Sequence, residues 1–313
     1  INELNTKKNK GNTDILIIGG GMVGLSLAFQ ISKKYPDLSI KILDKEKGLG
    51  FHNSGRNSGV LHAGIYYEPG SLKAKVCVEG AKRLKEWCLS EGLEVLSCGK
   101  IIVTQDENQD KQLNLLFERG RKNGANVELI DQKDLKNFSP YVYNATQKFI
   151  WSPNTCVVDP KSVIKKLAEK LIEMGVEIIY GANIFKIDSY DNKIDYSINL
   201  TKESCSYGHL FNCCGVNTDL IAKKFGIAKE FKILPFKGIY WKLKNSSSFS
   251  FNTNIYPVPD LNLPFLGVHI TPNLNGEVFF GPTAIPAFGK ENYYGFNGFE
   301  PLLTGQFIAN LTI

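Results

Sequence analysis

The sequence contains no unbroken apolar run as long as the ~18 residues that a helix needs to cross a membrane. We therefore expect any membrane contact to be peripheral. The opening segment Ile1 to Asn12 is polar and rich in lysine and has no apolar core, which argues against a secretory signal and predicts a flexible leader on a cytoplasmic protein. The seven cysteines are scattered and form no metal-type C-x-x-C pair, as expected in a reducing compartment.

The composition is that of a globular protein with a substantial core, since 43% of residues are hydrophobic and 22% are charged. A chain of 313 residues favours two domains. The formal net charge of +6 suits an anionic substrate, an acidic membrane surface or nucleic acid, and selects none of them. No concentrated Lys/Arg tract with interleaved aromatic residues is present, so we do not expect nucleic-acid binding.

A β-α-β unit is predicted near the N-terminus. The segment from Asp14 to Ile18 is a short apolar run, typical of a strand buried on both faces of a parallel sheet. A helical pattern then continues to about Tyr35, and Ser39 to Leu43 supplies a second strand that ends on Asp44. The residues spaced for the buried face of this helix are Val23, Leu27, Ala28 and Ile31.

Between the first strand and the helix lies the pattern Gly19-x-Gly21-x-x-Gly24. In the dinucleotide fingerprint, the first glycine permits a tight turn, the second allows close approach of a pyrophosphate, and the third lets helix and strand pack closely. Asp44 is placed at the end of the second strand to accept hydrogen bonds from ribose hydroxyls. The pattern predicts a dinucleotide, without distinguishing FAD from NAD.

The rest of the chain predicts further alternation of helices and strands. Helices are expected over 72–90, with Ser71 as the N-cap, over 106–123, and from Asp159-Pro160 onward. Strands are expected over 101–104, 176–180, 184–187 and 210–214. From Pro235 the sequence turns to aromatic and proline-rich strands, such as 239–243 and 265–270, which suit an antiparallel sheet.

We therefore predict an α/β protein in which a Rossmann-like nucleotide-binding domain is interleaved with an α+β substrate domain built on a mainly antiparallel sheet. The predicted bounds are 1–80 and 141–225 for the first domain, and 81–140 and 226–313 for the second.

A second group of small polar residues lies between His52 and Lys75 and is dense in glycine. Its amides and hydroxyls can surround the phosphate and ring edges of a cofactor. His62 and Tyr66 follow in the same run. A lone histidine is more often structural than catalytic, and both roles stay open for His62.

These segments carry a resemblance. The runs are N-S-G-V-L-H-A-G-I-Y-Y-E-P-G-S-L-K-A-K (57–75), V-V-D-P (157–160), F-N-C-C-G (211–215), P-F-K-G-I-Y (235–240) and Y-P-V-P-D-L-N-L-P-F-L-G-V-H-I-T-P (256–272). On these runs the chain resembles the D-amino-acid-oxidase-like FAD-dependent oxidoreductases and, within them, the L-2-hydroxyglutarate dehydrogenase/oxidase group.

The resemblance implies FAD as cofactor and assigns residues to it. The ADP half of FAD would be held by Gly19, Gly21, Gly24 and Asp44. The pyrophosphate and flavin edge would meet Ser54, Asn57, Ser58 and Gly59. Ile184 would offer backbone atoms to the adenine, and Gly215 would border the cofactor. His62 would lie near the flavin face, with Tyr66, Lys237 and His269 as substrate-side candidates.

The implied reaction is oxidation of a small anionic 2-hydroxy acid, L-2-hydroxyglutarate, to 2-oxoglutarate by hydride transfer from C2 to flavin N5. Histidine is the natural base for the hydroxyl proton, and His62 and His269 are the candidates. Lys237 and Tyr66 would hold the dicarboxylate. Structural interpretations stay open, a solvated strand lysine for Lys237 and a core imidazole bonded to a carbonyl for His269. The family's association with membranes favours a quinone as electron acceptor and contact with the inner membrane.

The chain departs from the family pattern at two places. Lys237 replaces the usual Arg of the P-F-R-G segment, which exchanges a planar fork for a point charge. The glycine-rich segment that normally completes the flavin site is not found after Gly281-Pro282, as expected of a fragment; a complete chain without it would retain flavin poorly.

Other functions remain as alternatives. An amine or amino-acid oxidase, or a glycerol-3-phosphate dehydrogenase-like protein, would share the glycine fingerprint. A flavin-binding RNA-modification or interaction protein and a relative that no longer binds cofactor complete the set.

Overall fold

The computed structural model describes residues 12–260 and 267–311. The chain forms two compact units, each assembled from separate segments. The first unit contains the N-terminal segment as far as Asn57, Pro160–Pro235, and the segment from Ala287 onward. The second unit contains Ser58–Asp159 and Phe236–Pro286. Within the described residues, no helix is long and apolar enough to cross a membrane.

The first unit is built on a six-stranded sheet, counted over the described ranges. Its order is β10 (Asn183–Asp188), β11 (Lys193–Ile198), β12 (Thr201–Asn212), β1 (Asn12–Ile18), β2 (Ile40–Leu43) and β9 (Glu177–Ile179). From β12 to β9 all neighbours are parallel, whereas β10, β11 and β12 form an antiparallel meander. This arrangement confirms the predicted Rossmann-like β-α-β unit and adds β11, which was not predicted.

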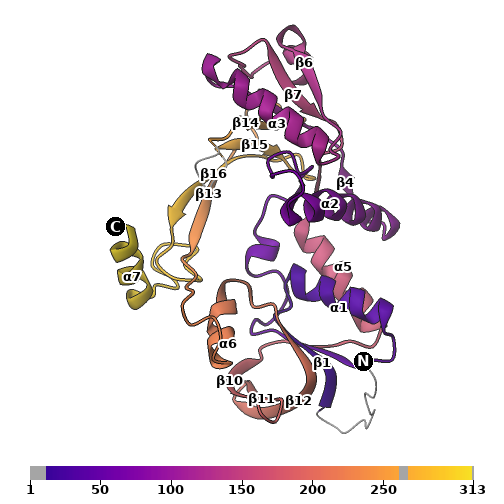
Figure 1. Cartoon of the computed structure of the whole chain (residues 1–313), viewed down its shortest axis with the longest axis vertical. Coiled ribbons are helices and arrows are strands. Elements are labelled where there is room, and N and C mark those ends of the chain that lie inside the picture. The colour runs from indigo at the N-terminus through magenta and orange to yellow at the C-terminus, as the bar shows by residue number, and fades with distance from the viewer. Residues whose placement is uncertain (1–11, 261–266, 312–313) are drawn as a thin grey trace. The chain divides into compact units, whose positions relative to one another are not determined.

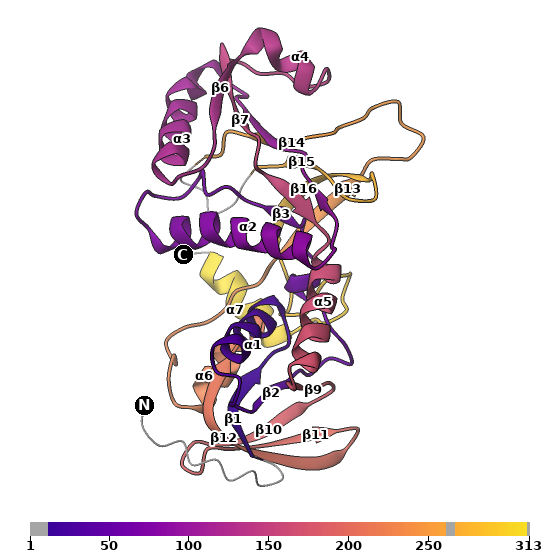
Figure 2. The same ribbon diagram turned by 90° about the vertical axis from the view of Figure 1, so that its right-hand side faces the viewer.

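Two helices, α1 (Met22–Lys34) and α5 (Pro160–Glu173), lie side by side next to the parallel strands (Figures 1 and 2). The predicted buried face of α1 is wrong at Val23, which is 70% exposed. Gly24 points inward because it packs against the backbone of Gly19, and Val23, about 100° away around the helix, therefore points outward. The residues of α1 that are buried are Gly24, Leu25, Ala28 and Ser32.

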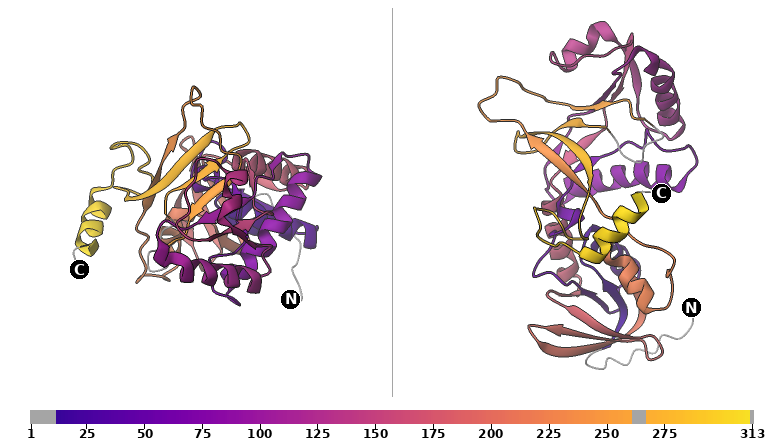
Figure 3. Two further views of the ribbon diagram at one scale, coloured as in Figure 1. Left: turned by 90° about the horizontal axis from the view of Figure 1, so that it is seen from above. Right: turned by 90° about the vertical axis from the view of Figure 1, so that its left-hand side faces the viewer.

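The first unit also contains α6 (Thr218–Lys224) and ends in α7 (Pro301–Leu311), the yellow helix of Figure 3. The Thr304 hydroxyl of α7 donates to the Phe288 carbonyl at 2.9 Å. In the loop before α7, the ammonium of Lys290 pairs with the carboxylate of Asp219 on α6, and both side chains are buried. This buried ion pair anchors the loop to the first unit.

The second unit contains a seven-stranded sheet, as far as its residues are described. The order is β13 (Phe236–Lys242), β16 (Val278–Pro286), β15 (His269–Pro272), β14 (Asn254–Pro257), β5 (Lys100–Val103), β7 (Lys148–Ser152) and β6 (Glu128–Asp131). Only the pair β14–β5 is parallel within it, so the predicted mainly antiparallel sheet is confirmed. A small sheet joins β3 (Val60–Leu61), β8 (Cys156–Val158) and β4 (Val95–Leu96).

Within the described residues, the α-helices of the second unit are α2 (Leu72–Ser90), α3 (Asp110–Lys122) and the short α4 (Leu135–Phe138). Ser71 caps α2 as predicted, because its hydroxyl accepts from the Ala74 amide at 3.2 Å. Leu113 and Leu116 of α3 pack in one core cluster with Ile102 and Tyr256 of the sheet. This packing holds the central strands β5 and β14 in place.

The compact units and the predicted domain bounds differ. Residues 58–80 and 141–159 belong to the second unit, whereas 226–235 and the segment from Ala287 belong to the first. Part of the strand predicted over 265–270 falls on residues 261–266, which lie outside the described residues; β15 begins at His269. The assignment of one domain to FAD and the other to substrate concerns ligands and stays a prediction.

Candidate functional site

The glycine loop of the first unit leaves no room for side chains. Gly19 has φ +103°, and a Cβ on it would lie 2.3 Å from the Cys213 carbonyl oxygen. A Cβ on Gly24 would lie 2.0 Å from the Gly19 carbonyl oxygen. A Cβ on Gly21 would meet the hydroxyl of Ser54 at 2.8 Å. The three predicted glycines therefore let β1, α1 and the end of β12 approach closely.

The N-terminus of α1 suits a negative charge. Gly21 is the N-cap residue and makes no side-chain capping bond, and the first turn contains no acidic residue. Amides at such a position point outward and carry partial positive charge, which suits a phosphate. The Ser54 hydroxyl accepts from the Met22 amide at 2.9 Å, and its own proton remains to be donated.

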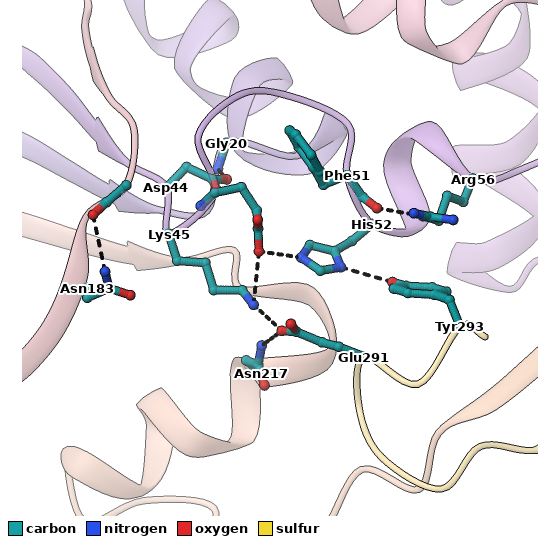
Figure 4. A network of polar contacts seen from close by, with 12 residues as sticks. Gly20, Asp44, Lys45, Phe51, His52, Arg56, Asn183, Asn217, Glu291 and Tyr293 are labelled. Atoms are coloured by element: carbon teal, nitrogen blue, oxygen red, sulfur yellow. Dashed lines mark hydrogen bonds and ion pairs between the residues drawn. The ribbon is translucent and has the colours of Figure 1, made fainter. Parts of the chain in front are cut away.

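Asp44 lies at the end of β2, beside the glycine loop. Its Oδ2 accepts from the amide of Gly20, which is drawn beside it in Figure 4, at 2.7 Å. Its Oδ1 accepts from the Glu46 amide at 2.8 Å. A carboxylate has about four acceptor positions, so two remain for ribose hydroxyls. Asp44 can therefore fix the loop and bind a nucleotide at once.

The other predicted cofactor residues fall in different places. Asn57 donates to the carbonyls of Asn53 and Ser54 and holds their short helical turn η1 (Asn53–Gly55). Gly215 begins η4 (Gly215–Asn217) directly after β12, with φ +55°. Ser58 and Gly59 belong to the second unit, where the Gly59 carbonyl accepts from the Val158 amide at 3.0 Å. Their contact with a cofactor stays a prediction.

Ile184 lies on β10, opposite Tyr196 of β11. The segment just before it runs beside the end of β2, since the Ala182 amide donates to the Asp44 carbonyl at 2.9 Å. The contact of Ile184 with adenine stays a prediction; the structure shows that the segment before Ile184 lies beside Asp44.

A polar network near Asp44 was not anticipated from sequence (Figure 4). His52 bonds through Nε2 to the Glu46 carboxylate and through Nδ1 to the Tyr293 hydroxyl, both at 2.9 Å. Lys45 pairs with Glu46 and with Glu291. Tyr293 and Glu291 come from the loop that Lys290 anchors, more than 200 positions after His52, so no local signal could have joined them.

This network could be taken for a metal centre, because Glu46, His52 and Glu291 bring ligand atoms within 4.8 Å of one another. The Lys45 ammonium already pairs with both carboxylates. The negative charge of Glu46 and Glu291 is thus compensated by a lysine of the protein itself. The network is better described as a set of polar contacts that attach the segment 287–300 to the loop after Asp44.

The second unit brings together three of the four residues predicted for catalysis or substrate binding, namely His62, Tyr66 and His269. The rings of Tyr256 and His269 stack at 3.9 Å between centroids, and the ring of His62 meets Tyr256 edge-on at 6.0 Å. The Lys100 ammonium lies 4.8 Å from the centroid of the Tyr66 ring and 5.2 Å from that of Tyr256. We call these five residues the aromatic–lysine cluster.

Two members of the cluster, Lys100 and Tyr256, were missed by the sequence reasoning. Lys100 stands immediately before Ile101-Ile102-Val103, and a charged residue at the edge of a buried apolar strand was the available signal. Tyr256 is in one of the runs that carry the family resemblance, but nothing there distinguished it.

The cluster keeps both histidines neutral. Burial, together with the nearby Lys100 and His269, lowers the pKa of His62 to about 3. Burial also lowers the pKa of His269, and the charge of Lys100 lowers it further. The hydrogen bond to the Gly267 carbonyl acts in the opposite direction and only partly offsets them. Because the His269 Nδ1 lies 3.0 Å from that carbonyl oxygen, Nδ1 carries the proton and Nε2 is the acceptor.

Lys237 lies elsewhere on the same sheet. It is on β13, opposite Ile285 of β16, whereas His269 is on β15 and Lys100 on β5. Its side chain is half-buried. The predicted role of Lys237 in substrate binding stays a prediction.

Comparison with known proteins shows the family to which the chain belongs. Residues 14–306 match the family model described as FAD dependent oxidoreductase. The chain belongs to the FAD dependent oxidoreductase family. A relative from Caenorhabditis briggsae, "L-2-hydroxyglutarate dehydrogenase, mitochondrial", is 40% identical over 290 residues, 91% of this chain and 66% of that protein. A bacterial "L-2-hydroxyglutarate dehydrogenase" from Indibacter alkaliphilus is 39% identical over 281 residues, 89% of this chain and 69% of that protein.

The chain thus spans about two thirds of the length of these relatives. A solved structure supports the same family: L-alpha-glycerophosphate oxidase from Mycoplasma pneumoniae with FAD bound superposes with a TM-score of 0.79 at 25% identity, covering 94% of this chain and 77% of that one. The predicted fold class and the predicted family are confirmed.

The first unit fits the FAD that the family name implies. The glycine loop is free of side chains where a pyrophosphate must approach, the amides of α1 point outward, and Asp44 has acceptor positions left for a ribose. Among the sequence-predicted cofactor residues, the structure brings Gly19, Gly21, Gly24, Asp44 and Ser54 together around the start of α1.

Proposed function

We propose that this protein oxidises L-2-hydroxyglutarate to 2-oxoglutarate with FAD as cofactor. The observation that carries the proposal is the pair of neutral histidines beside tyrosines and a lysine in the second unit, because oxidation of a hydroxy acid needs an acceptor for the hydroxyl proton. The substrate is taken from the names of the relatives. When bound, FAD supplies the chemistry that accepts the hydrogen and electrons leaving C2.

In this proposal the first unit binds the cofactor. The amides at the start of α1 and the Ser54 hydroxyl hold the pyrophosphate, and Asp44 accepts from the ribose. Ile184 offers backbone atoms to the adenine; the bond from the Ala182 amide to the Asp44 carbonyl supports this role, because it holds the start of β10 beside Asp44.

His62 is the preferred proton acceptor. Its Nδ1 is buried and has no hydrogen-bond partner within residues 12–260 and 267–311, whereas His269 uses Nδ1 on a carbonyl and is 6% exposed. His62 as a whole is half-buried, whereas His269 is buried. We assign His269 to positioning, since its ring stacks on Tyr256 and its tautomer is fixed by Gly267.

The remaining partners are proposed from the family resemblance alone. A quinone or another carrier would take the electrons, and contact with the inner membrane would be peripheral. The cytoplasmic location predicted from the sequence stays a prediction.

The proposal is tested by mixing the FAD-loaded protein with candidate substrates in the absence of oxygen and recording the visible flavin absorbance. We expect L-2-hydroxyglutarate to bleach the flavin, and its D enantiomer to leave it oxidised. Glycerol 3-phosphate is included because L-alpha-glycerophosphate oxidase is structurally similar. Bleaching by glycerol 3-phosphate or an amino acid, with none by L-2-hydroxyglutarate, would replace the proposed substrate. A preparation without flavin bands would overturn the proposal.

A further inference from the structure

Lys100 is a fully buried cation that finds no hydrogen-bond partner among the described residues. Its side chain is 0% exposed, and its Nζ is among the buried polar atoms that make no hydrogen bond. Its closest described surroundings are the faces of Tyr66 and Tyr256, at 4.8 and 5.2 Å from the ring centroids. Rings attract a cation, but they do not replace the hydrogen bonds of an ammonium group.

The protein provides little compensating charge. Over the residues that the structure describes, Lys100 forms no ion pair, and the one group that favours its charged form is the thiol of Cys77. Burial raises the pKa of Cys77, so this thiol is uncharged at neutral pH. Burial lowers the pKa of Lys100 to about 8, which still leaves most of the ammonium protonated. An unpaired buried charge is costly, and such a cost is typically retained where a ligand supplies the counter-charge.

Two residues next to this charge carry further polar atoms with no partner in the part of the chain that the structure describes. They are the Tyr66 hydroxyl, whose ring lies beside the Lys100 ammonium, and the His62 Nδ1, and both atoms are buried. Burial raises the pKa of Tyr66 well above its ordinary value, so its hydroxyl is a donor. One ammonium and one phenol therefore offer donors together, the combination that a carboxylate accepts.

We propose that Lys100 binds a carboxylate group of the substrate, with the Tyr66 hydroxyl as a second donor. This inference rests on the proposed function, because it names the group that recognises the hydroxy acid as an anion. It gives Lys100 a role that the sequence reasoning assigned to Lys237.

The arrangement also couples binding to proton transfer. Lys100 is one of the groups that hold the pKa of His62 low. A carboxylate on Lys100 neutralises this charge, so His62 becomes a stronger base when substrate arrives. The ability of His62 to accept a proton therefore increases only when the substrate carboxylate is bound.

The test compares Lys100→Met and Lys100→Gln with Lys148→Met, which removes the same charge from an exposed position on the neighbouring strand β7. Binding of 2-oxoglutarate to the FAD-loaded proteins is measured by calorimetry, and the melting temperature is measured without ligand. We expect both Lys100 variants to bind at least about 30-fold more weakly, as when one partner of a buried charged pair is removed. Lys148→Met should bind as the parent does. The ligand-free melting temperature of Lys100→Met should not fall.

Unchanged affinity in the Lys100 variants would overturn the inference. So would a large fall of the ligand-free melting temperature in both variants, since Lys100 would then be structural. A parent protein that fails to oxidise L-2-hydroxyglutarate but binds 2-oxoglutarate through Lys100 would remove the proposed substrate and leave the anion site standing.

Discussion

The carbonyl oxygen of Gly19 lies 2.0 Å from the point where a Cβ on Gly24 would stand. This approach fixes the rotation of α1 against β1 and determines which of its residues are buried. It also places the first amides of α1 at the end of the strand, where a phosphate would bind.

Gly24→Ala should therefore damage both the fold and the cofactor site. The clash is with backbone atoms that cannot move easily, and we expect a loss of about 2–3 kcal/mol in the free energy of unfolding, typical of overpacking. FAD affinity, measured by flavin fluorescence, should fall at least about tenfold, the equivalent of 1.4 kcal/mol. Gly80→Ala is the control, since Gly80 lies on α2 with open space around it and should gain about 0.5–1 kcal/mol. Wild-type FAD affinity in Gly24→Ala would contradict the assignment.

Ser54→Ala should weaken FAD binding beyond its effect on stability. The Ser54 hydroxyl bonds to the Met22 amide and keeps a proton for the phosphate, so its loss should lower FAD affinity about fivefold to tenfold. Ser71→Ala removes a comparable helix cap from the second unit and should cost a similar ~1 kcal/mol of stability. If the two variants have the same FAD dissociation constant, Ser54 does not contact the cofactor.

His62→Gln should lower kcat by about 10²–10⁴-fold, the usual loss of a general base, with FAD still bound. The measurement is the rate of flavin bleaching in single turnovers. His209→Gln is the control, since His209 is exposed on β12. Because the pKa of His62 in the free protein is about 3, kcat/KM should not fall near pH 6.5 as the solution becomes acidic. An acid limb near pH 6.5 that disappears in His62→Gln would contradict this environment.

Lys100 should make the ligand-free protein less stable at neutral pH. The pKa of Lys100 is about 8 in the folded protein, against an ordinary value of 10.5, so the difference is 10.5 − 8 = 2.5. At 1.36 kcal/mol for each pKa unit, this difference corresponds to a penalty of about 3 kcal/mol in the free energy of unfolding. Because the unfolded chain holds this proton more strongly, the penalty is present below pH 8 and is lost between pH 8 and 10.5.

Lys100→Met should therefore have the higher free energy of unfolding at pH 7, and the advantage should shrink as pH rises through this window. Urea titrations at several pH values measure it. The titratable groups facing Lys100 are His62, Tyr66, Cys77, Tyr256 and His269. They are present in both proteins, so the difference between the two isolates Lys100. A lower stability of Lys100→Met at pH 7 would show that the ammonium is satisfied in the folded state.

Lys290→Met should destabilise the first unit by about 3 kcal/mol or more, because it leaves the Asp219 carboxylate buried without its closest partner. Burial by itself would raise the pKa of Asp219, but the hydrogen bond and the charge of Lys290 hold this pKa below its ordinary value. Lys223→Met is the matched control, since Lys223 reaches the same carboxylate at 3.4 Å from a more exposed position and should cost about 1 kcal/mol or less. Equal losses in the two variants, measured in urea, would contradict the anchoring role of Lys290.

The sequence alone predicted the β1–α1–β2 unit, its glycines and the position of Asp44. These features are local, since the loop geometry is specified by residues within about one β-α-β unit and by backbone conformations that only glycine adopts easily. The same reasoning failed at Val23, because hydrophobic spacing leaves the rotation of a helix open by about one residue and the contact of Gly24 with Gly19 decides it.

Only the tertiary structure joined the other groups. His52 meets Tyr293, and Lys100 meets Tyr256, across more than 150 positions of sequence. The order of the strands in the sheet brings Lys100 to Tyr256, and the segment after Ala287 brings Tyr293 back to the first unit. Both arrangements depend on the packing of the entire unit, which no local pattern encodes. The sequence identified His62, Tyr66 and His269 as chemically suitable side chains. Their burial beside the buried ammonium of Lys100, and hence their charge states, follows from the folded second unit alone.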